Sequence, residues 1–533
     1  MTSALSPQAV RTALDSGDPL AVIDVRDPLD YVQGHVLEST FVPRHDLERR
    51  LPTLVPNPAT PVVLCDRCGD RAARDARWLA DLGYEDVSFL DGGVDAWAAA
   101  GFELVESVGH VHATALNYTS KRFGEEVDAD RDLPRLTPSE LAEMQSEESV
   151  LVVDVRNPEE YRRWGTVPGS VNVEGVDLAL YAEALRETEE TPVVVHCAGR
   201  TRSIIGTATL DALGVPNVYE LENGTMGWQL AGRDLADGSG RPADVAPDPT
   251  RVDRLRERVA SLLVEADVPR LTPTEVDELR ASVAADQSVY LVDVRREAEY
   301  EREHVPGATW VPGGQLLQTA EAHLAVRTAE IVLVSETHVR AGITAYWLAS
   351  MGFPHVSVLD GGVTAWTDEG RPVAEGVDEP EPPDADSVRA TVDFVDARAL
   401  STRLEDGGPT VLDVDDPDAF VEAHVPGARW TSRYDLEADL AAGTVDASEP
   451  LVLTCRDGTC STYAAAAVGV AFPDLEVAAL RGGVESWRET GLAVAEGEEG
   501  MVRPPRAVER KPYGQGSAEM RRYLEWEESL VER

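Results

Sequence analysis

Four short sequence signals recur four times along this 533-residue chain, always in the same order. The first is an apolar run ending in an acidic turn: AVIDVRDPLDY, LVVDVRNPEEY, YLVDVRREAEY and TVLDVDDPDAF. The second is a short turn: GHVLES, GTVPGS, EHVPGA and AHVPGA. The third is a β-type run that enters a loop, PVVLCDRCGDR, PVVVHCAGRTR, EIVLVSETHVR and PLVLTCRDGTC, and the fourth is LDGGVDAW, LENGTMGW, LDGGVTAW and LRGGVESW. Such repetition indicates one structural unit present in four copies.

The spacing of the signals is nearly constant. From the first aspartate to the first loop residue the distances are 41, 43, 42 and 42 positions, and from there to the closing tryptophan 32, 31, 31 and 32. The first loop residues are Cys65, Cys197, Ser335 and Cys455. The spacing predicts four domains followed by a tail with a helix, over residues 1–108, 134–235, 270–375, 392–496 and 497–533.

Within each copy, short Val/Ile/Leu runs alternate with longer helical patterns such as RAARDARWLADLG. Continuous apolar strands separated by helices are typical of a parallel sheet that is covered on both faces. We therefore expect four small doubly wound α/β domains. Between the second and third copies, RVDRLRERVASLLVEA predicts an additional helix.

The charge balance is strongly acidic, with 96 Asp and Glu against 48 Lys and Arg and a net charge of −48. Lysine occurs only at Lys121 and Lys511. Such a field disfavours nucleic acid and anionic membranes as partners. The composition resembles that of salt-tolerant cytosolic proteins of halophiles, although a merely acidic protein is the alternative. Neither a leader segment nor an apolar run long enough for a bilayer is evident, so we expect a cytoplasmic protein.

The third signal carries the candidate chemistry. In open α/β sheets, ligands bind beyond the carboxyl ends of the strands, where this signal places a cysteine in three copies. Inward-pointing backbone N–H groups and the positive end of the next helix stabilise a thiolate there. In the second copy, Gly199 allows a tight curl, and Arg200 and Arg202 add positive charge for an anion. The five cysteines are too few for a disulfide scaffold, and they suggest no metal site.

Together, the Asp-Val-Arg strand, the His-Val-Pro-Gly-Ala turn, the Cys loop and the Gly-Gly-x-x-x-Trp closure resemble the rhodanese family of sulfurtransferases. HCAGRTRSIIG followed by ENGTMGWQLAG resembles the second domain of bacterial four-rhodanese proteins. The resemblance implies a two-step reaction without a cofactor. A cysteine takes sulfur from thiosulfate or a related donor as a persulfide, and a thiol, a protein acceptor or cyanide removes it.

The second copy is the best candidate for an active site. Cys197 and Arg202 have the Cys-x4-Arg spacing typical of active rhodaneses, and the alternative reading is a buried structural thiol. The residues expected to form the anion-binding loop are Ala198, Gly199, Arg200, Thr201, Arg202 and Ser203.

The first copy has one more loop residue between Cys65 and Arg71. In relatives with this fold, a longer loop suits larger oxyanions. Alternatively, Cys68 resolves a Cys65 persulfide by forming a disulfide. The third copy, with Ser335, is expected to be inactive, because a hydroxyl is far less acidic than a thiol.

In the fourth copy, Cys460 occupies the Arg position of the loop and Asp415 replaces Arg in the first turn. Loss of positive charge should raise the pKa of Cys455. Either Cys455 and Cys460 form a redox pair, or both thiols are inert.

Three functions remain open from sequence. The first is a sulfurtransferase that uses Cys197, with Cys65 and Cys455 as further sulfur sites. The second is a persulfide carrier or scaffold with little turnover of free donor. The third is phosphate or arsenate chemistry at Cys65, which the neighbouring Asp66 and Asp70 disfavour by charge.

Overall fold

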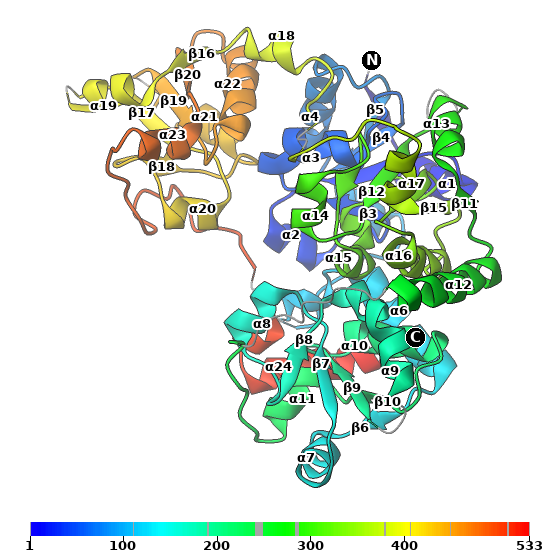
Figure 1. Ribbon diagram of the computed structural model, residues 1–533. Helices are drawn as coiled ribbons and strands as arrows, with labels where there is room; N and C mark the ends of the chain where they lie inside the picture. The colour runs from blue at the N-terminus through cyan, green and yellow to red at the C-terminus, as the bar shows by residue number, and fades with distance from the viewer. Residues whose placement is uncertain are drawn as a thin grey trace. The chain divides into compact units, whose positions relative to one another are not determined.

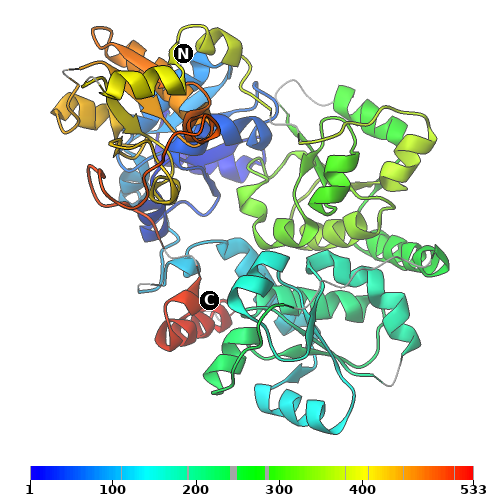
Figure 2. The ribbon, with the colours of Figure 1, turned by 60° about the vertical axis from the view of Figure 1, so that its left-hand side comes forward.

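The computed structural model describes residues 2–531, apart from 110, 189–190, 240–248, 283–286, 378–379, 406, 448 and 509–510. It contains four five-stranded sheets, in which every strand pairing is parallel (Figure 1). The strand orders are β1-β5-β4-β2-β3, β6-β10-β9-β7-β8, β11-β15-β14-β12-β13 and β16-β20-β19-β17-β18. Helices lie on both faces of the sheets (Figure 2). The predicted fold class, four tandem doubly wound α/β domains, is confirmed.

The first two domains follow the predicted alternation of strands and helices. The first contains β1 Ser3–Leu5, α1 Pro7–Ser16, β2 Ala21–Asp24, α2 Pro28–Gln33, β3 Ser39–Phe41, η1 Arg44–Asp46, α3 Leu47–Leu54, β4 Val62–Cys65, α4 Asp70–Asp81, β5 Val87–Leu90 and α5 Gly93–Ala99. The second contains β6 Arg135–Leu136, α7 Pro138–Glu147, β7 Leu151–Asp154, α8 Pro158–Trp164, β8 Ser170–Asn172, η3 Gly175–Tyr181, α9 Ala182–Glu187, β9 Val193–His196, α10 Thr201–Ala212, β10 Val218–Leu221 and α11 Gly224–Leu230.

The last two domains repeat this order. The third contains β11 Arg270–Leu271, α13 Pro273–Ser282, β12 Val289–Asp293, α14 Glu297–Arg302, β13 Thr309–Trp310, α15 Gly313–Gln318, η4 Ala320–Ala322, β14 Glu330–Val334, α16 Val339–Ser350, β15 Val356–Leu359 and α17 Gly362–Asp368. The fourth contains β16 Asp393–Val395, α19 Ala397–Glu405, β17 Thr410–Asp413, α20 Pro417–Glu422, β18 Arg429–Trp430, α21 Leu436–Ala442, β19 Leu451–Thr454, α22 Thr459–Ala471, β20 Val477–Leu480 and α23 Gly483–Glu489.

Further helices lie outside the four repeats. They are η2 His112–Thr114, α6 Tyr118–Arg131, α12 Pro249–Glu265, α18 Ala385–Arg389, η5 Pro512–Gly514 and α24 Ser517–Glu528. Helix α12 covers the segment in which the sequence predicts an additional helix. No helix in the described ranges is long and apolar enough to cross a membrane.

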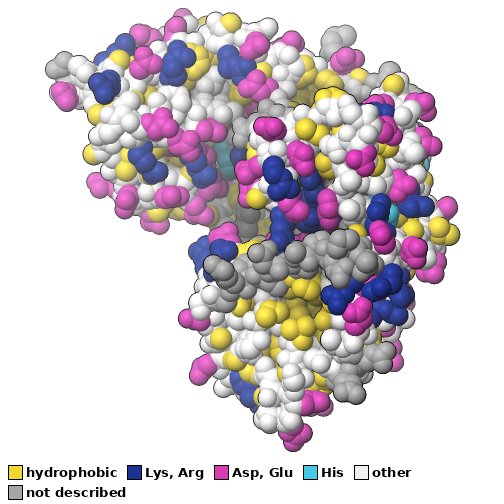
Figure 3. Space-filling model, in the orientation of Figure 1, with side chains coloured by type: hydrophobic (Ala, Val, Ile, Leu, Met, Phe, Trp, Pro, Cys, Tyr) yellow, Lys and Arg dark blue, Asp and Glu magenta, His cyan; other side chains and the backbone are white. Residues whose placement is uncertain are grey.

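The chain divides into two compact units. One consists of residues 1–105 and 379–508, so it holds the first and fourth domains. The other consists of residues 106–378 and 509–533, so it holds the second and third domains together with α6, α12 and α24. Acidic side chains are spread over the face seen in Figure 3, with Lys and Arg side chains between them.

The closing tryptophan of each repeat is a core residue. Trp97, Trp228, Trp366 and Trp487 are 1–4% exposed. In each case the indole Nε1 donates to the carbonyl oxygen six residues later, at 2.7–3.1 Å. Each tryptophan therefore fixes the chain that leaves its domain, as well as filling the core.

A buried ion pair follows the strand beside the central one, β2, β7 or β12, in three domains. Asp24–Arg26, Asp154–Arg156 and Asp293–Arg295 have N–O distances of 2.6–2.7 Å, with every side chain at most 4% exposed. The same guanidinium donates to the carbonyl of the second signal, as Arg26 does to Gly34 at 2.7 Å. In the fourth domain Asp415 takes the place of the arginine, and burial raises the pKa of Asp413 well above its ordinary value.

We predict that Arg295→Met lowers the free energy of unfolding of the unit that contains it by about 3–5 kcal/mol, because Asp293 would remain buried without its counterion. Urea denaturation followed by tryptophan fluorescence measures the change. The control is Arg302→Met, at an exposed position in the same domain, which should shift the curve by less than about 0.5 kcal/mol. Equal shifts for the two variants would contradict the prediction.

Candidate functional site

The four candidate loops occupy equivalent places in the four sheets. Each follows the central strand β4, β9, β14 or β19 and leads into α4, α10, α16 or α22. The fourth signal fixes the loop from behind, as Thr225 N donates to Cys197 O and Met226 N to Ala198 O, both at 2.9 Å. Gly224 has φ of +51°, and a Cβ there would lie 2.3 Å from the Cys197 carbonyl oxygen, so this position requires glycine.

The loop of the second domain keeps its backbone N–H groups available for a ligand. Cys197 is 2% exposed, and its Sγ lies 3.6 Å from Ser203 Oγ. Among the described residues, no side chain accepts a hydrogen bond from the backbone N–H groups of 198–203. Because α10 begins at Thr201, its positive dipole end adds to these N–H groups. The loop therefore has the properties of an anion site next to a thiol.

The two arginines of this loop are already paired. Arg200 donates to both oxygens of Glu125 at 2.6–2.7 Å and to Asp128 at 3.0 Å. Arg202 Nη1 donates to Glu160 Oε2 at 2.5 Å. The sequence suggests free cationic groups at these positions. In the structure both charges are neutralised, because an acidic chain supplies carboxylates around each arginine.

The loop of the first domain is filled by its own aspartate. Asp66 accepts hydrogen bonds from the N–H groups of Gly69, of Arg71 at 2.8 Å and of Ala72 at 3.2 Å. Burial and the nearby Asp24 raise the pKa of Cys65 well above its ordinary value. The Arg71 side chain points to the fourth domain of the same unit, where it binds Tyr434 O at 2.6 Å and Asp435 at 2.7 Å.

Cys65 and Cys68 are in different surroundings. Cys65 is fully buried, whereas Cys68 is exposed and its thiol donates to Asp70 Oδ2 at 3.8 Å. The described contacts include none between the two thiols. The Cys65–Cys68 pairing that the sequence leaves open thus gains no support from this geometry.

The third loop holds a hydroxyl and a neutralised arginine. Ser335 is fully buried, and its Oγ accepts from Ala341 N at 3.3 Å. Arg340 binds Glu299 and Glu336 at 2.7 Å. A base near Ser335 is not found among the described contacts, so this loop lacks an activated nucleophile.

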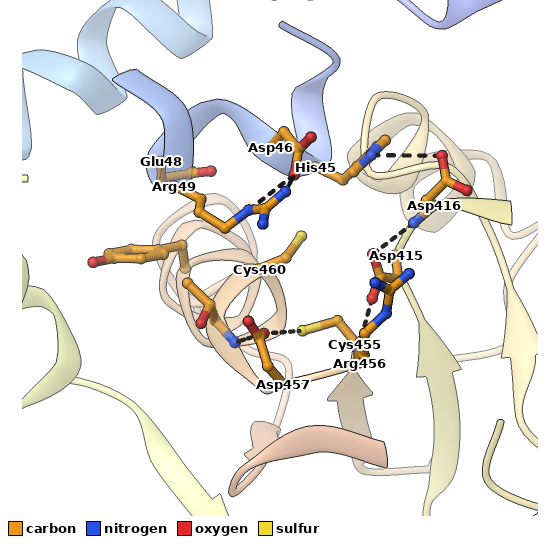
Figure 4. A pocket seen from close by; sticks show the side chains of 12 residues that line it. His45, Asp46, Glu48, Arg49, Asp415, Asp416, Cys455, Arg456, Asp457 and Cys460 are labelled. Atoms are coloured by element: carbon orange, nitrogen blue, oxygen red, sulfur yellow. Dashed lines mark hydrogen bonds and ion pairs between the residues drawn. The ribbon is translucent and has the colours of Figure 1, made fainter. Parts of the chain in front are cut away.

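The loop of the fourth domain opens into a pocket of about 240 Å³ that the first domain completes within the same unit (Figure 4). Cys455 and Cys460 both line it. Its carboxylates outnumber its cations, and they are Asp46, Glu48, Asp415, Asp416 and Asp457.

Both thiols of this pocket are held in the protonated state. Burial, Asp415 and Asp457 raise the pKa of Cys455 far above its ordinary value. Burial and Cys455 do the same for Cys460. Asp415 Oδ2 also accepts from Arg456 N at 2.6 Å, so a carboxylate occupies part of this loop as well.

Four residues around Cys197 lie outside the sequence signals. Lys121 of α6 forms an ion pair with Glu527 of α24 at 3.0 Å, and Tyr523 OH donates to the same carboxylate at 3.0 Å. Lys511 binds Glu160, the partner of Arg202, at 2.8 Å. The two lysines of the chain thus both lie at this site. Neither lysine lies in a repeated signal, so the repeat does not predict this cluster. The described residues contain no group of three or more His, Cys, Asp or Glu placed to hold a metal ion.

Comparison with known proteins agrees with this architecture. The Rhodanese-like domain family matches residues 6–100, 137–231, 273–369 and 396–490. A crystal structure of a thiosulfate sulfurtransferase from Pseudomonas aeruginosa superposes with a TM-score of 0.89 and 34% identity, over 99% of this chain and 97% of that one. The thiosulfate sulfurtransferase of Azotobacter vinelandii is 28% identical over 243 residues, 38% of this chain and 85% of the relative. The chain therefore belongs to the rhodanese family, with four rhodanese-like domains in tandem.

Proposed function

We propose that the protein is a sulfurtransferase that moves sulfane sulfur from thiosulfate or a related donor to a thiol or cyanide through a persulfide on Cys197. The observation that carries the proposal is the contrast among the loops. The second domain alone, among the four described, combines a cysteine, the Cys-x4-Arg spacing and loop N–H groups that no side chain occupies. The names of the similar proteins, thiosulfate sulfurtransferases, support the choice of donor.

In the first step, the Cys197 thiolate attacks the outer sulfur of thiosulfate. A new S–S bond forms, the S–S bond of the donor breaks, and sulfite leaves with the electron pair. In the second step, the acceptor attacks the outer sulfur of the persulfide and returns the electron pair to Cys197 as thiolate. The loop N–H groups stabilise the negative charge on the sulfur in transfer, as an oxyanion hole does.

The proposal assigns turnover to the second domain, residues 134–235, and supporting roles to the domains over 1–108, 270–375 and 392–496. Cys65 and Cys455 are weak nucleophiles because both thiol pKa values are raised. Phosphate or arsenate chemistry at Cys65 is disfavoured, since the Asp66 carboxylate takes the N–H groups that an oxyanion needs.

A persulfide carrier is the second candidate. The inactive third loop favours a scaffold role for part of the chain. The 2% exposure of Cys197 favours small acceptors over direct transfer to a protein. We also propose a cytoplasmic protein adapted to high salt, on the basis of the net charge of −48.

We predict that incubation with thiosulfate adds one sulfur atom, about 32 Da, to the wild-type protein and to Cys65→Ser and Cys455→Ser, but not to Cys197→Ser. Intact-mass spectrometry measures the gain. Thiosulfate:cyanide turnover should fall at least about a thousandfold in Cys197→Ser and stay within about twofold in the other two variants. A persulfide that persists in Cys197→Ser would contradict the assignment.

At pH 8, we expect Cys455 to react slowly with iodoacetamide, because only the thiolate reacts and its pKa is raised. Asp415→Asn removes one of the charges that raise this pKa, so the rate at pH 8 should increase about three- to tenfold. Peptide mass spectrometry follows the modification. Asp418→Asn, an exposed position on α20, is the control and should leave the rate unchanged. A rate in Asp415→Asn equal to that of the wild type would refute the charge effect.

Added KCl should raise the melting temperature, with most of the gain below about 1 M, because the Debye length falls from about 10 Å at 0.1 M to about 3 Å at 1 M. Screening reduces the repulsion among the 96 acidic side chains. Differential scanning fluorimetry measures the transition, with sucrose of equal osmolality as the uncharged control. Equal effects of KCl and sucrose would count against salt adaptation.

A further inference from the structure

Two helices outside the rhodanese repeat cover the Cys197 loop. Helix α24 packs on Met226 of α11, whose N–H donates to the loop carbonyl of Ala198. The contact is part of a hydrophobic cluster that includes Tyr523 and Trp526. Helix α6 packs on α10 so closely that a Cβ on Gly124 would lie 2.7 Å from Thr201 Cγ2. Figures 1 and 2 show α24 (red) against the second domain, in the same compact unit.

A buried ion pair joins these two helices above the loop. Lys121 Nζ lies 3.0 Å from Glu527 Oε1, and the two side chains are 12% and 0% exposed. Thr201 Oγ1 donates to the same oxygen at 3.3 Å, which places the carboxylate at the beginning of α10. Although burial favours the neutral amine, Glu527, Tyr523 and Cys197 raise the pKa of Lys121, so the ammonium form is retained beside the thiol.

The other oxygen of this carboxylate has no partner. Glu527 Oε2 is buried and makes no hydrogen bond among the described residues. It lies 3.2 Å from the position of a Cβ on Gly199, and therefore over the middle of the loop. Burying a carboxylate oxygen without a hydrogen bond lowers the stability of the fold. Such an oxygen therefore points to a role other than stability. In the first domain, by contrast, the Asp66 carboxylate accepts hydrogen bonds from the N–H groups of the loop itself.

The other cations near Cys197 are paired with carboxylates whose two oxygens are both bonded. Arg200 is held by Glu125 and Asp128, and Arg202 by Glu160, which Lys511 also binds. In contrast, Lys121 is paired with Glu527, whose second oxygen has no hydrogen bond among the described residues. An anion that enters the loop can therefore replace Glu527 as the partner of Lys121 at a smaller cost than it could free either arginine.

We propose that Lys121 binds the anionic end of the sulfur donor at Cys197, and that Glu527 is a built-in competitor which occupies the ammonium until the donor displaces it. The identity of the anion as a sulfur donor rests on the proposed function. The site itself is an anion site. Through this site, a strongly acidic protein can bind a small anion. Because the anion must displace the Glu527 carboxylate, weakly binding anions are excluded.

The test compares two alkylating reagents of similar size at Cys197 in the full chain, anionic iodoacetate and neutral iodoacetamide. Their rate ratio isolates the effect of charge, because changes in thiolate population or access affect both reagents. We expect Lys121→Met to lower the iodoacetate/iodoacetamide ratio about tenfold, and Glu527→Gln to raise it by a similar factor. Lys121→Arg should keep the ratio near that of the wild type. Glu525→Gln, exposed on the same helix, is the matched control and should leave it unchanged.

Unchanged ratios in Lys121→Met and Glu527→Gln would overturn the proposal, even if both rates shift together. If Lys121→Met does not fold, the near-isosteric Glu527→Gln decides alone. Persulfide formation with thiosulfate is then measured in the same variants, and its rate should follow the iodoacetate rate. If the ratios shift as expected but thiosulfate leaves no persulfide on Cys197, the anion site stands and the proposed donor is wrong.

Discussion

The buried aspartate–arginine pair that follows β2, β7 and β12, beside the central strand, is the interaction on which the loops of the first three domains depend. It holds the acidic turn and the second signal together beneath the cysteine loop, as Arg156 does by binding Asp154 and the Gly165 carbonyl. A buried pair of this kind adds little net stability, but losing one partner is expensive, so it fixes one geometry. The fourth domain shows the alternative. Without the arginine, burial raises the pKa of Asp413 well above its ordinary value, and Asp415 accepts a hydrogen bond from Arg456 N in the loop.

Carboxylates distinguish the four loops more than cysteines do. Asp66 accepts from the N–H groups of the first loop, and Asp415 and Asp457 do so in the fourth. In the second loop, the carboxylates among the described residues bond to side chains and leave the backbone N–H groups without a carboxylate acceptor. A loop whose N–H groups point inward binds anions in general, including carboxylates of the same chain. In a chain with so many acidic side chains, keeping one loop free of them is the condition for binding an external anion.

The repeat predicted the fold and the position of Cys197 because the signals are local. Strand, turn and loop follow one another within each copy, so their spacing carries the geometry. The partners of Arg200 and Arg202 were not predicted. Glu125 and Lys511 come from segments with no repeated pattern, and Glu160 lies in the first signal, whose spacing along the chain does not show its contact with Arg202. The same holds for Asp66. Its sequence position suggested repulsion of anions, but only the structure shows that its carboxylate occupies the loop.

The origin of α24 has a consequence for how the protein is made. Thr201 and Glu527 are 326 residues apart in the chain, yet their side chains meet over the Cys197 loop. At about 5–20 residues per second, a ribosome needs about 16–65 s to synthesise the intervening segment. During that time the second domain can fold with an uncovered thiol and an unpaired Lys121. Until α24 is made, the nascent chain therefore lacks the Lys121–Glu527 pair over the Cys197 loop, so this cover is added late in synthesis.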